Sequence, residues 1–220
     1  MHERTRFDQD GRLWLRQVVS GSGIQALKHL MGLDGRPGAR VAPEDALFQA
    51  VKAQQVSHQI AGLWPGMKPV RIVSFDKSSA SNWKVSWHQD RVIAVKARAD
   101  VPAFSNWSQK NDVWHCEPPL EILQEMLFVR LHLDPSTPET GAMEIAVGSH
   151  KAGLVRREHA KAVAQEYQTE MTEAAPGDVL ILPMLALHKS DRAVRPDSRA
   201  VLRIDFAPEN LLPAPLAWSV

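Results

Sequence analysis

The chain has 220 residues, of which 44% are hydrophobic and 23% are charged, a composition typical of a globular protein with a sizeable core. Its 26 Lys and Arg residues nearly balance 25 Asp and Glu residues, so overall charge gives no reason to expect binding to nucleic acid. A single cysteine, Cys116, excludes an internal disulfide framework, and no apolar run approaches the roughly 18 residues that a membrane-spanning helix needs. The polar N-terminal residues lack the apolar stretch of a signal peptide, so we expect a cytoplasmic protein that forms one domain over residues 1–220.

Helical periodicity dominates the first third of the chain, from about residue 20 to residue 64. Apolar residues recur at helical spacing in the segments 21–32 and 42–64. In the second segment, Asp45 belongs to an acidic first turn and Gly62 is the expected end of the helix.

The remainder of the chain has the pattern of β-structure. Six segments are β-branched, apolar or alternating: 69–75, 91–97, 126–134, 142–147, 178–183 and 199–207. Connectors rich in Pro, Gly, Asp and Ser separate them, and one further helix is expected around 157–167. Helices followed by many short strands predict a mainly β sandwich or barrel over about 69–207, with the N-terminal helices as a buttress (an α+β protein).

Two His-x-Asp tripeptides could each present an imidazole and a carboxylate on one face of a strand: His88 with Asp90, and His132 with Asp134. Redox iron with open coordination positions favours two His and one carboxylate. The candidate for the additional imidazole is His188, which ends the apolar run that follows PGDVLILP, where a strand would deliver its last side chain to the mouth of a barrel.

The residues after His188 predict an anion-binding group beside the metal. Ser190 lies two positions further on, and Arg199 begins the next strand across an expected hairpin that would return its guanidinium to the metal. Arg199 and Arg203 are an even number of positions apart, so both would point to the same face of a strand. Spacing alone therefore does not show which of them lies beside the metal. A guanidinium fixed there would suit a bidentate pair with a dicarboxylate.

Three segments, taken in order, resemble the phytanoyl-CoA dioxygenase family of Fe(II)/2-oxoglutarate oxygenases. FDKSSASNWKVSWHQD resembles the strand with the family's metal-binding His-x-Asp, and HKSDRAVRPDSR resembles its distal His-x-Ser with an Arg eleven residues after the His. LHLDPSTPETGAMEIAVGSHKAGLV is similar to the family's Asn-Gly…Pro-Gly-Ser-His segment, although Thr140 and Val147 replace its Asn and its Pro. The resemblance extends from about Phe7 to Phe206.

The resemblance implies a double-stranded β-helix, the jelly roll of cupin-like proteins, with a metal and a cosubstrate. It implies that His88, Asp90 and His188 hold Fe(II). It also implies that Arg199 binds the far carboxylate of 2-oxoglutarate and that Ser190 hydrogen-bonds the same group. O2 would be the oxidant.

By the same resemblance, His132 and Asp134 bind no metal, and Asp134 before Pro135 reads independently as a turn residue. Trp107 corresponds loosely to a family tryptophan near the cosubstrate.

The substrate pocket is the least determined part of the site. Aromatic residues cluster near the first His-x-Asp, and the candidates for its walls are Trp83, Trp87, Trp114 and His115. Cys116 beside His115 does not make a zinc site, because the usual four-ligand set is missing. Site roles for Lys77 and Asn82 are left open, and His150 is expected in a loop near the mouth.

The resemblance implies an enzyme that oxidises a small organic molecule and converts 2-oxoglutarate to succinate. Halogenating relatives have a small residue in place of the carboxylate ligand, so Asp90 implies hydroxylation or a related oxidation such as desaturation. A non-catalytic jelly roll that binds a metal or small ligand is the alternative. A nucleic-acid demethylase of the AlkB type is disfavoured by the balanced charge. The substrate and the oligomeric state stay open.

Overall fold

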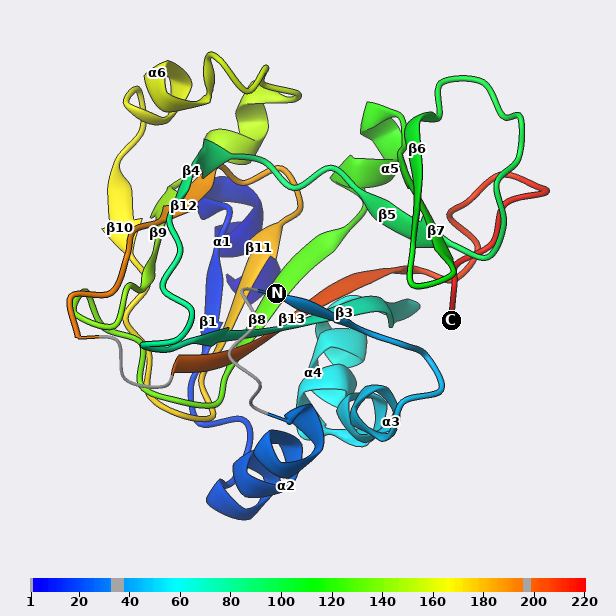
Figure 1. Ribbon diagram of the computed structural model, residues 1–220. Helices are drawn as coiled ribbons and strands as arrows, with labels where there is room; N and C mark the ends of the chain where they lie inside the picture. Colours follow the sequence, from blue (N-terminus) through cyan, green and yellow to red (C-terminus); the bar gives the residue numbers. More distant parts are fainter. Residues whose placement is uncertain (1, 33–37, 196–198) are drawn as a thin grey trace.

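A computed structural model describes residues 2–32, 38–195 and 199–220, and these residues contain three antiparallel sheets (Figure 1). The six-stranded sheet has the order β1 (Leu13–Leu15), β11 (Val179–Pro183), β8 (Leu127–His132), β13 (Arg199–Pro208), β3 (Met67–Lys77) and β2 (Ala39–Val41). The four-stranded sheet has the order β10 (Thr169–Met171), β9 (Met143–Ala146), β12 (His188–Ser190) and β4 (Val85–His88). The three-stranded sheet has the order β5 (Ile93–Val95), β7 (Val113–Glu117) and β6 (Ser105–Lys110).

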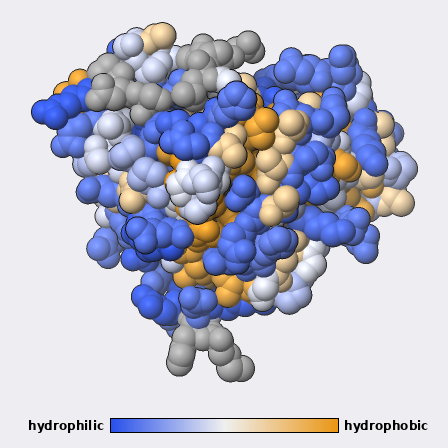
Figure 2. Space-filling model, turned by 90° about the horizontal axis from the view of Figure 1, so that it is seen from below, coloured by the Kyte–Doolittle hydropathy of each residue, from blue (hydrophilic) through white to orange (hydrophobic). Residues whose placement is uncertain are grey.

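The helices are short. They are α1 (His2–Asp10), α2 (Gly21–Met31), α3 (Ala46–Ala53), α4 (Gln55–Leu63), α5 (Leu120–Gln124) and α6 (Ala160–Ala164), with a 3₁₀ turn at η1 (Ser149–Ala152). Helices α2, α3 and α4 cover the outer face of the six-stranded sheet, and a continuous hydrophobic core lies between them (Figure 1). Seen from the helical side, the surface is mostly hydrophilic, with hydrophobic side chains visible between the polar ones (Figure 2). No helix in the described ranges has both the length and the apolar character needed to cross a membrane.

Strand β8 shows how the sequence divides its side chains between two environments. Leu127, Val129 and Leu131 belong to the core under the helices, as the period of two in a strand requires. The alternate residues Phe128 and Arg130 line a cavity on the opposite face, which looks toward the four-stranded sheet. The same strand therefore supplies both the main core and the wall of a cavity.

The observed architecture confirms the expected mainly β jelly roll with a helical buttress. The six-stranded and four-stranded sheets are the two layers of the roll, and all of their strand pairs are antiparallel. Each of the six segments expected to form a strand contains one, namely β3, β5, β8, β9, β11 and β13.

The helical segment expected over 42–64 is two helices. Gln54 has an extended backbone, with φ −74° and ψ 155°, which ends α3 and starts α4. Asp45 is not part of the first helical turn but caps it, because its carboxylate accepts a hydrogen bond from the Leu47 N–H. Gly62 does not end α4, which continues to Leu63.

The three-stranded sheet was not expected as a unit. Its β6–β7 hairpin turns at Asn111 and Asp112, whose φ angles of 50° and 59° suit Asn and Asp better than most other residues. Its polar, half-exposed β6 strand has little apolar alternation, and this explains why periodicity alone does not reveal it.

Leu202 on β13 tests the core between the sheet and the helices, because its side chain is fully buried there. We expect Leu202→Ala to lower the free energy of unfolding by about 2–5 kcal/mol, through lost apolar contact and the cavity left behind. Urea denaturation measures the change. Leu30→Ala is the control, because Leu30 on α2 is 39% exposed, and it should change stability by less than about 1 kcal/mol. Equal losses for the two variants would contradict this description of the core.

Candidate metal centre

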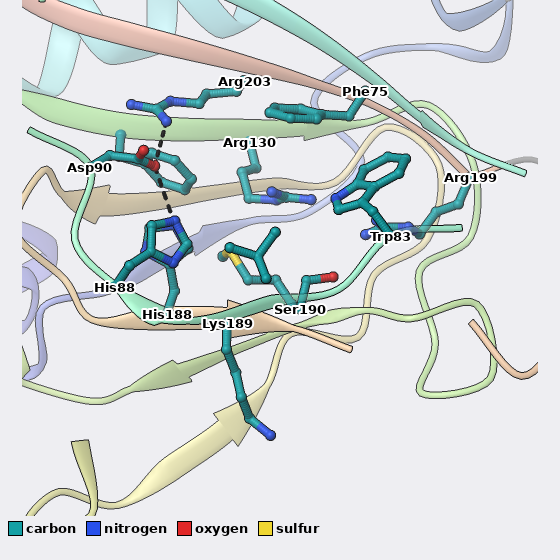
Figure 3. Close-up of a pocket in the computed structure, with 13 residues that line it drawn as sticks. Phe75, Trp83, His88, Asp90, Arg130, His188, Lys189, Ser190, Arg199 and Arg203 are labelled. Carbon is teal, nitrogen blue, oxygen red and sulfur yellow. Dashed lines mark ion pairs between the residues drawn. The ribbon is translucent and has the colours of Figure 1, made fainter. Parts of the chain in front are cut away.

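His88, Asp90 and His188 lie together at one end of the jelly roll. Within the described parts of the chain they form a group whose ligating atoms all lie within 4.8 Å of one another. In the antiparallel pair β4–β12, His88 stands directly opposite His188, and their ring centroids are 4.3 Å apart. Asp90 follows β4 by two residues, and its Oδ2 lies 3.3 Å from His188 Nε2. One strand pair thus brings two imidazoles and a carboxylate to one point (Figure 3).

Backbone carbonyls fix the orientation of both rings. His88 Nδ1 lies 2.8 Å from the carbonyl oxygen of Ser86, and His188 Nδ1 lies 2.9 Å from that of Ala186. A carbonyl oxygen only accepts hydrogen bonds, so each Nδ1 donates its proton there. The lone pair of each ring is therefore on Nε2, the tautomer that a metal ligand needs.

Gln89, between the two candidate ligands of the His-x-Asp, anchors the segment in the protein. Its side-chain amide donates to the carbonyl oxygens of Gly153 and Leu185 at 2.7 and 2.8 Å. Its carbonyl oxygen accepts from the Val155 N–H at 2.9 Å. With three hydrogen bonds, this buried side chain holds the turn on which Asp90 is presented. Sequence reasoning did not identify this role, because the partners come from distant loops.

Arg203 fixes the carboxylate of Asp90. Its guanidinium forms an ion pair with Asp90 Oδ2 and binds Asp205 through two hydrogen bonds of 2.7 and 3.1 Å. Burial alone would raise the pKa of Asp90, but the charge of Arg203 outweighs it and holds the pKa well below 3.8. Asp90 is therefore an anion at neutral pH.

The imidazole of His88 is neutral at physiological pH. Burial, assisted by the neighbouring His188, lowers its pKa from 6.5 to about 4. A neutral imidazole and an ionised carboxylate are the protonation states that bind a divalent metal. The electrostatics of the site therefore fit a metal ion without further rearrangement of protons.

The three groups open onto a cavity of about 210 Å³. Its apolar walls include Phe75, Trp83 and Phe128. Arg199 lines the cavity away from the triad and is 2% exposed. Its Nε and one terminal nitrogen are buried without a hydrogen-bond partner in the described structure. Burial lowers the pKa of Arg199 to about 10, which still leaves it charged at neutral pH.

The Ser190 hydroxyl lines the same cavity but is already engaged. It donates to the carbonyl oxygen of Gly141 at 3.0 Å and accepts from Lys77 Nζ at 3.0 Å. Gly141 has a φ of 71°, and a Cβ at this position would lie 2.8 Å from the Asp191 carbonyl oxygen, so only glycine fits the turn. A carboxylate that bound Ser190 would have to compete with this carbonyl.

The path of the chain after the expected strand over 178–183 differs from the expectation. β11 ends at Pro183, and His188 begins the separate strand β12 in the other sheet. Arg199 does not return in a hairpin with β12, because β13 pairs with β3 and β8 in the six-stranded sheet. The arginine therefore reaches the cavity from the layer opposite His188.

The aromatic candidates divide between the cavity and other parts of the fold. Trp83 lines the cavity, with Lys77 Nζ 5.0 Å from its ring centre. Trp87, Trp107 and Trp114 are not among the residues that line it. Trp107 and Trp114 pack edge to face in the three-stranded sheet, with centroids 6.4 Å apart, and Trp87 packs near α6 with Lys189 above its ring.

The remaining candidates also lie away from the triad. His115 lines a different cavity and accepts a hydrogen bond from Arg40 Nε at 3.2 Å, so the structure does not place it in the substrate pocket. His150 lies in η1 against Gly11, rather than in a loop at the mouth. Asn82 joins the β3–β4 connection to Ala193 through two hydrogen bonds of 2.9 and 2.8 Å.

The second His-x-Asp is not part of the candidate metal site. His132 is fully buried, stacks near Trp14 and has no hydrogen-bond partner on either ring nitrogen in the described structure. Asp134 points elsewhere, because it binds Lys28 at 2.7 Å and accepts from the Ala200 N–H. The two side chains do not converge on one ligand.

A jelly roll that presents two His and one carboxylate in this way is the scaffold of a non-haem iron oxygenase. The sequence matches the family model described as Phytanoyl-CoA dioxygenase (PhyH) over residues 7–201, and the protein therefore belongs to this family of Fe(II)/2-oxoglutarate-dependent oxygenases. No curated protein sequence matches the chain.

Several solved structures share the fold. AviO1 from Streptomyces viridochromogenes Tue57 is similar over 97% of this chain and 97% of its own, with 17% identity and a TM-score of 0.66. HygX from Streptomyces hygroscopicus with nickel, 2-oxoglutarate and hygromycin B bound is similar over 95% and 87%, with 17% identity and a TM-score of 0.63. SnoN, a non-heme alpha ketoglutarate dependent epimerase from nogalamycin biosynthesis, is similar over 94% and 82%, with 13% identity and a TM-score of 0.66.

Lys77 gives the stability of the protein a specific pH dependence. Burial, followed by the charges of Arg199 and Arg130, lowers its pKa from 10.5 to about 7. Between these two values the unfolded state binds more protons than the folded state, so the free energy of unfolding rises with pH. Between pH 7 and pH 9, we expect the free energy of unfolding of wild type to rise by about 2 kcal/mol more than that of Lys77→Met. Urea denaturation at each pH measures the two values.

The control is Lys96→Met, which removes an exposed lysine, and its stability should follow that of wild type across this pH range. If wild type and Lys77→Met changed in parallel, the charge of Lys77 would not be suppressed by folding.

Proposed function

We propose that the protein is an Fe(II)- and 2-oxoglutarate-dependent dioxygenase that hydroxylates, or otherwise oxidises, a small organic molecule. The observation that carries the proposal is the convergence of His88, Asp90 and His188, with ligating atoms within 4.8 Å, at the end of a cavity that also contains the unpaired Arg199. The first feature suits a divalent metal, and the second suits a dicarboxylate. Membership of the family supports a reaction that uses both the metal and the dicarboxylate.

The three ligands would hold iron by two neutral imidazole Nε2 atoms and one carboxylate oxygen, which leaves coordination positions for other groups. When bound, iron with 2-oxoglutarate and O2 supplies the oxidising power, and 2-oxoglutarate becomes succinate and CO2. The protein's own contribution is orientation. The carbonyls of Ser86 and Ala186 hold the two rings, and Arg203 holds the carboxylate of Asp90.

Arg199, rather than Arg203, is suited to bind the far carboxylate of 2-oxoglutarate. Both guanidiniums line the cavity, but Arg203 is already neutralised by Asp90 and Asp205. Arg199 has buried nitrogens without an acceptor, and an unpaired buried charge is costly unless a ligand satisfies it. This difference in pairing supports a choice that spacing in the sequence leaves open.

The substrate would occupy the apolar part of the cavity near the triad. Phe128 would form an apolar wall on the side of the triad, while Phe75 and Trp83 would exclude water from the end of the cavity that contains Arg199 (Figure 3). Family members act on small molecules, and HygX has been solved with hygromycin B bound. These observations support a small-molecule substrate for this chain without identifying it.

The metal ligands are tested by comparing the two His-x-Asp pairs. His88→Ala removes one of three ligands, and we expect it to weaken Ni²⁺ or anaerobic Fe²⁺ binding at least about 100-fold, because the remaining pair leaves the ion incompletely coordinated. His132→Leu removes a buried imidazole outside the group and should leave metal affinity within about threefold of wild type. Calorimetry on folded protein, checked by circular dichroism, gives both affinities. The reverse ranking would assign the metal to the second pair.

The reaction itself is tested by succinate formation. Purified protein with Fe²⁺ and 2-oxoglutarate should release succinate in air and none under nitrogen, and a true substrate in a small-molecule screen should raise the rate and gain an oxygen atom. Asp90→Ala should reduce the rate at least about 1,000-fold, because the metal loses its anionic ligand. Mass spectrometry identifies both products. A protein that bound metal and 2-oxoglutarate without forming succinate would instead be a non-catalytic binding protein.

A further inference from the structure

Arg130, in the middle of β8, is a buried cation without a partner. It is 7% exposed, and its side chain lines the cavity beside the triad. Across residues 2–32, 38–195 and 199–220, no hydrogen bond or ion pair to its guanidinium is found, and its Nε is sealed from solvent. A buried guanidinium without an acceptor is costly, so this arrangement points to a ligand that supplies one.

Arg203 lines the same cavity as Arg130 but is paired with carboxylates. It stands directly opposite Arg130 in the β8–β13 pair, and two carboxylates, Asp90 and Asp205, neutralise it. Arg130 and Arg199 line the same space, and neither has an ion pair with a carboxylate in the described residues. The protein thus supplies acceptors for one guanidinium of the cavity and leaves two without them.

The unpaired cations are close enough to repel one another. Burial, followed by the charges of Arg199 and Arg203, lowers the pKa of Arg130 to about 9. The same two arginines, Arg130 and Arg199, help to lower the pKa of Lys77. This end of the cavity therefore has an excess of positive charge that one bound carboxylate would relieve.

We propose that Arg130 is a second arginine of the cosubstrate site, which binds the far carboxylate of 2-oxoglutarate together with Arg199. The inference rests on the proposed function. Figure 3 shows the guanidinium of Arg130 between Asp90 and Arg199, directed toward Trp83 and Arg199, on the way from the triad to Arg199. A carboxylate has about four lone-pair sites, enough to accept hydrogen bonds from two guanidiniums. The two arginines would reach it from the neighbouring strands β8 and β13.

A consequence of this arrangement is stronger selection for 2-oxo diacids over 2-oxo monoacids. A monoacid would bind at the triad but leave both guanidiniums buried and unpaired, which disfavours it more than a single unpaired arginine would. The rival reading is that Arg130 binds an anionic group of the oxidised substrate. The two alternatives differ in whether the affinity for 2-oxoglutarate, measured without substrate, depends on Arg130.

The experiment is anaerobic calorimetry on full-length protein loaded with Ni²⁺, with metal content measured for each variant. The probes are 2-oxoglutarate and 2-oxobutyrate, which has the same 2-oxo acid group but no far carboxylate. The variants are Arg130→Met, Arg130→Lys and Arg199→Met. Arg40→Met is the matched control, because Arg40 lines the other cavity and binds His115.

We expect Arg130→Met and Arg199→Met each to weaken 2-oxoglutarate about 10- to 100-fold, the effect of losing a charged hydrogen bond, and to leave 2-oxobutyrate unchanged. Arg130→Lys should lose less affinity for 2-oxoglutarate than Arg130→Met, because lysine keeps the positive charge but lacks the paired N–H donors of a guanidinium. Arg40→Met should bind both probes like wild type. Unchanged 2-oxoglutarate affinity in Arg130→Met would overturn the inference and favour an anionic substrate group. Equal weakening of both probes would also overturn it, because Arg130 would then act at the triad end.

Thermal unfolding without ligand provides a readout that a merely structural arginine would not give. Replacing an unpaired buried cation by Met removes repulsion with Arg199, so Arg130→Met should unfold at a higher temperature than wild type and gain less from added 2-oxoglutarate. A lower midpoint in the absence of ligand would overturn the inference. Wild-type protein that binds Ni²⁺ but not 2-oxoglutarate would overturn the proposed function itself, an outcome distinct from a failure of Arg130 alone.

Discussion

The antiparallel pairing of β4 with β12 is the constraint on which the whole site depends. It places His88 directly opposite His188, which is 100 residues away in the sequence. Because alternate residues of a strand face opposite sides, a slip of one residue in this pairing would turn one imidazole away from the other. Hydrogen bonds from Nδ1 of each ring to the carbonyl two residues earlier in the chain then fix the rotation, and Gln89 anchors the turn that presents Asp90. The candidate metal site is thus a consequence of strand register.

The second organising feature is the distribution of charge on the cavity side of the six-stranded sheet. Arg203 is neutralised by Asp90 and Asp205, and it fixes the ionised carboxylate where a metal would meet it. Arg130 and Arg199 are left without such partners. Buried charges of one sign disfavour the ligand-free protein and favour a bound anion, because the donors are already oriented when the anion arrives. This distribution of charge supports the proposal that the cavity binds a metal at one end and a carboxylate at the other.

Local sequence patterns predicted the elements of the fold better than their connections. The long apolar alternation of β8 and β13 identified both strands, because each buries one face under the helices. The break at Gln54 was missed, since neither glycine nor proline marks it. β12 has only three residues, too few for a periodic pattern, and His188 was therefore assigned to the end of the preceding strand. A short strand is defined by its neighbours, not by its own sequence.

The sequence by itself determined the residue types of the site, namely one His-x-Asp, a later His and an arginine eleven residues beyond it. The resemblance to the family implied His88, Asp90 and Arg199, and only the tertiary structure shows that His188 stands opposite His88, that Arg203 is paired with carboxylates and that Arg130 lines the cavity. Arg130 was not among the candidates from the sequence, because one arginine in an apolar strand gives no sign of whether it has a partner. The physical reason is that burial and ion pairing depend on residues far apart in the chain, which strand pairing between the layers brings together.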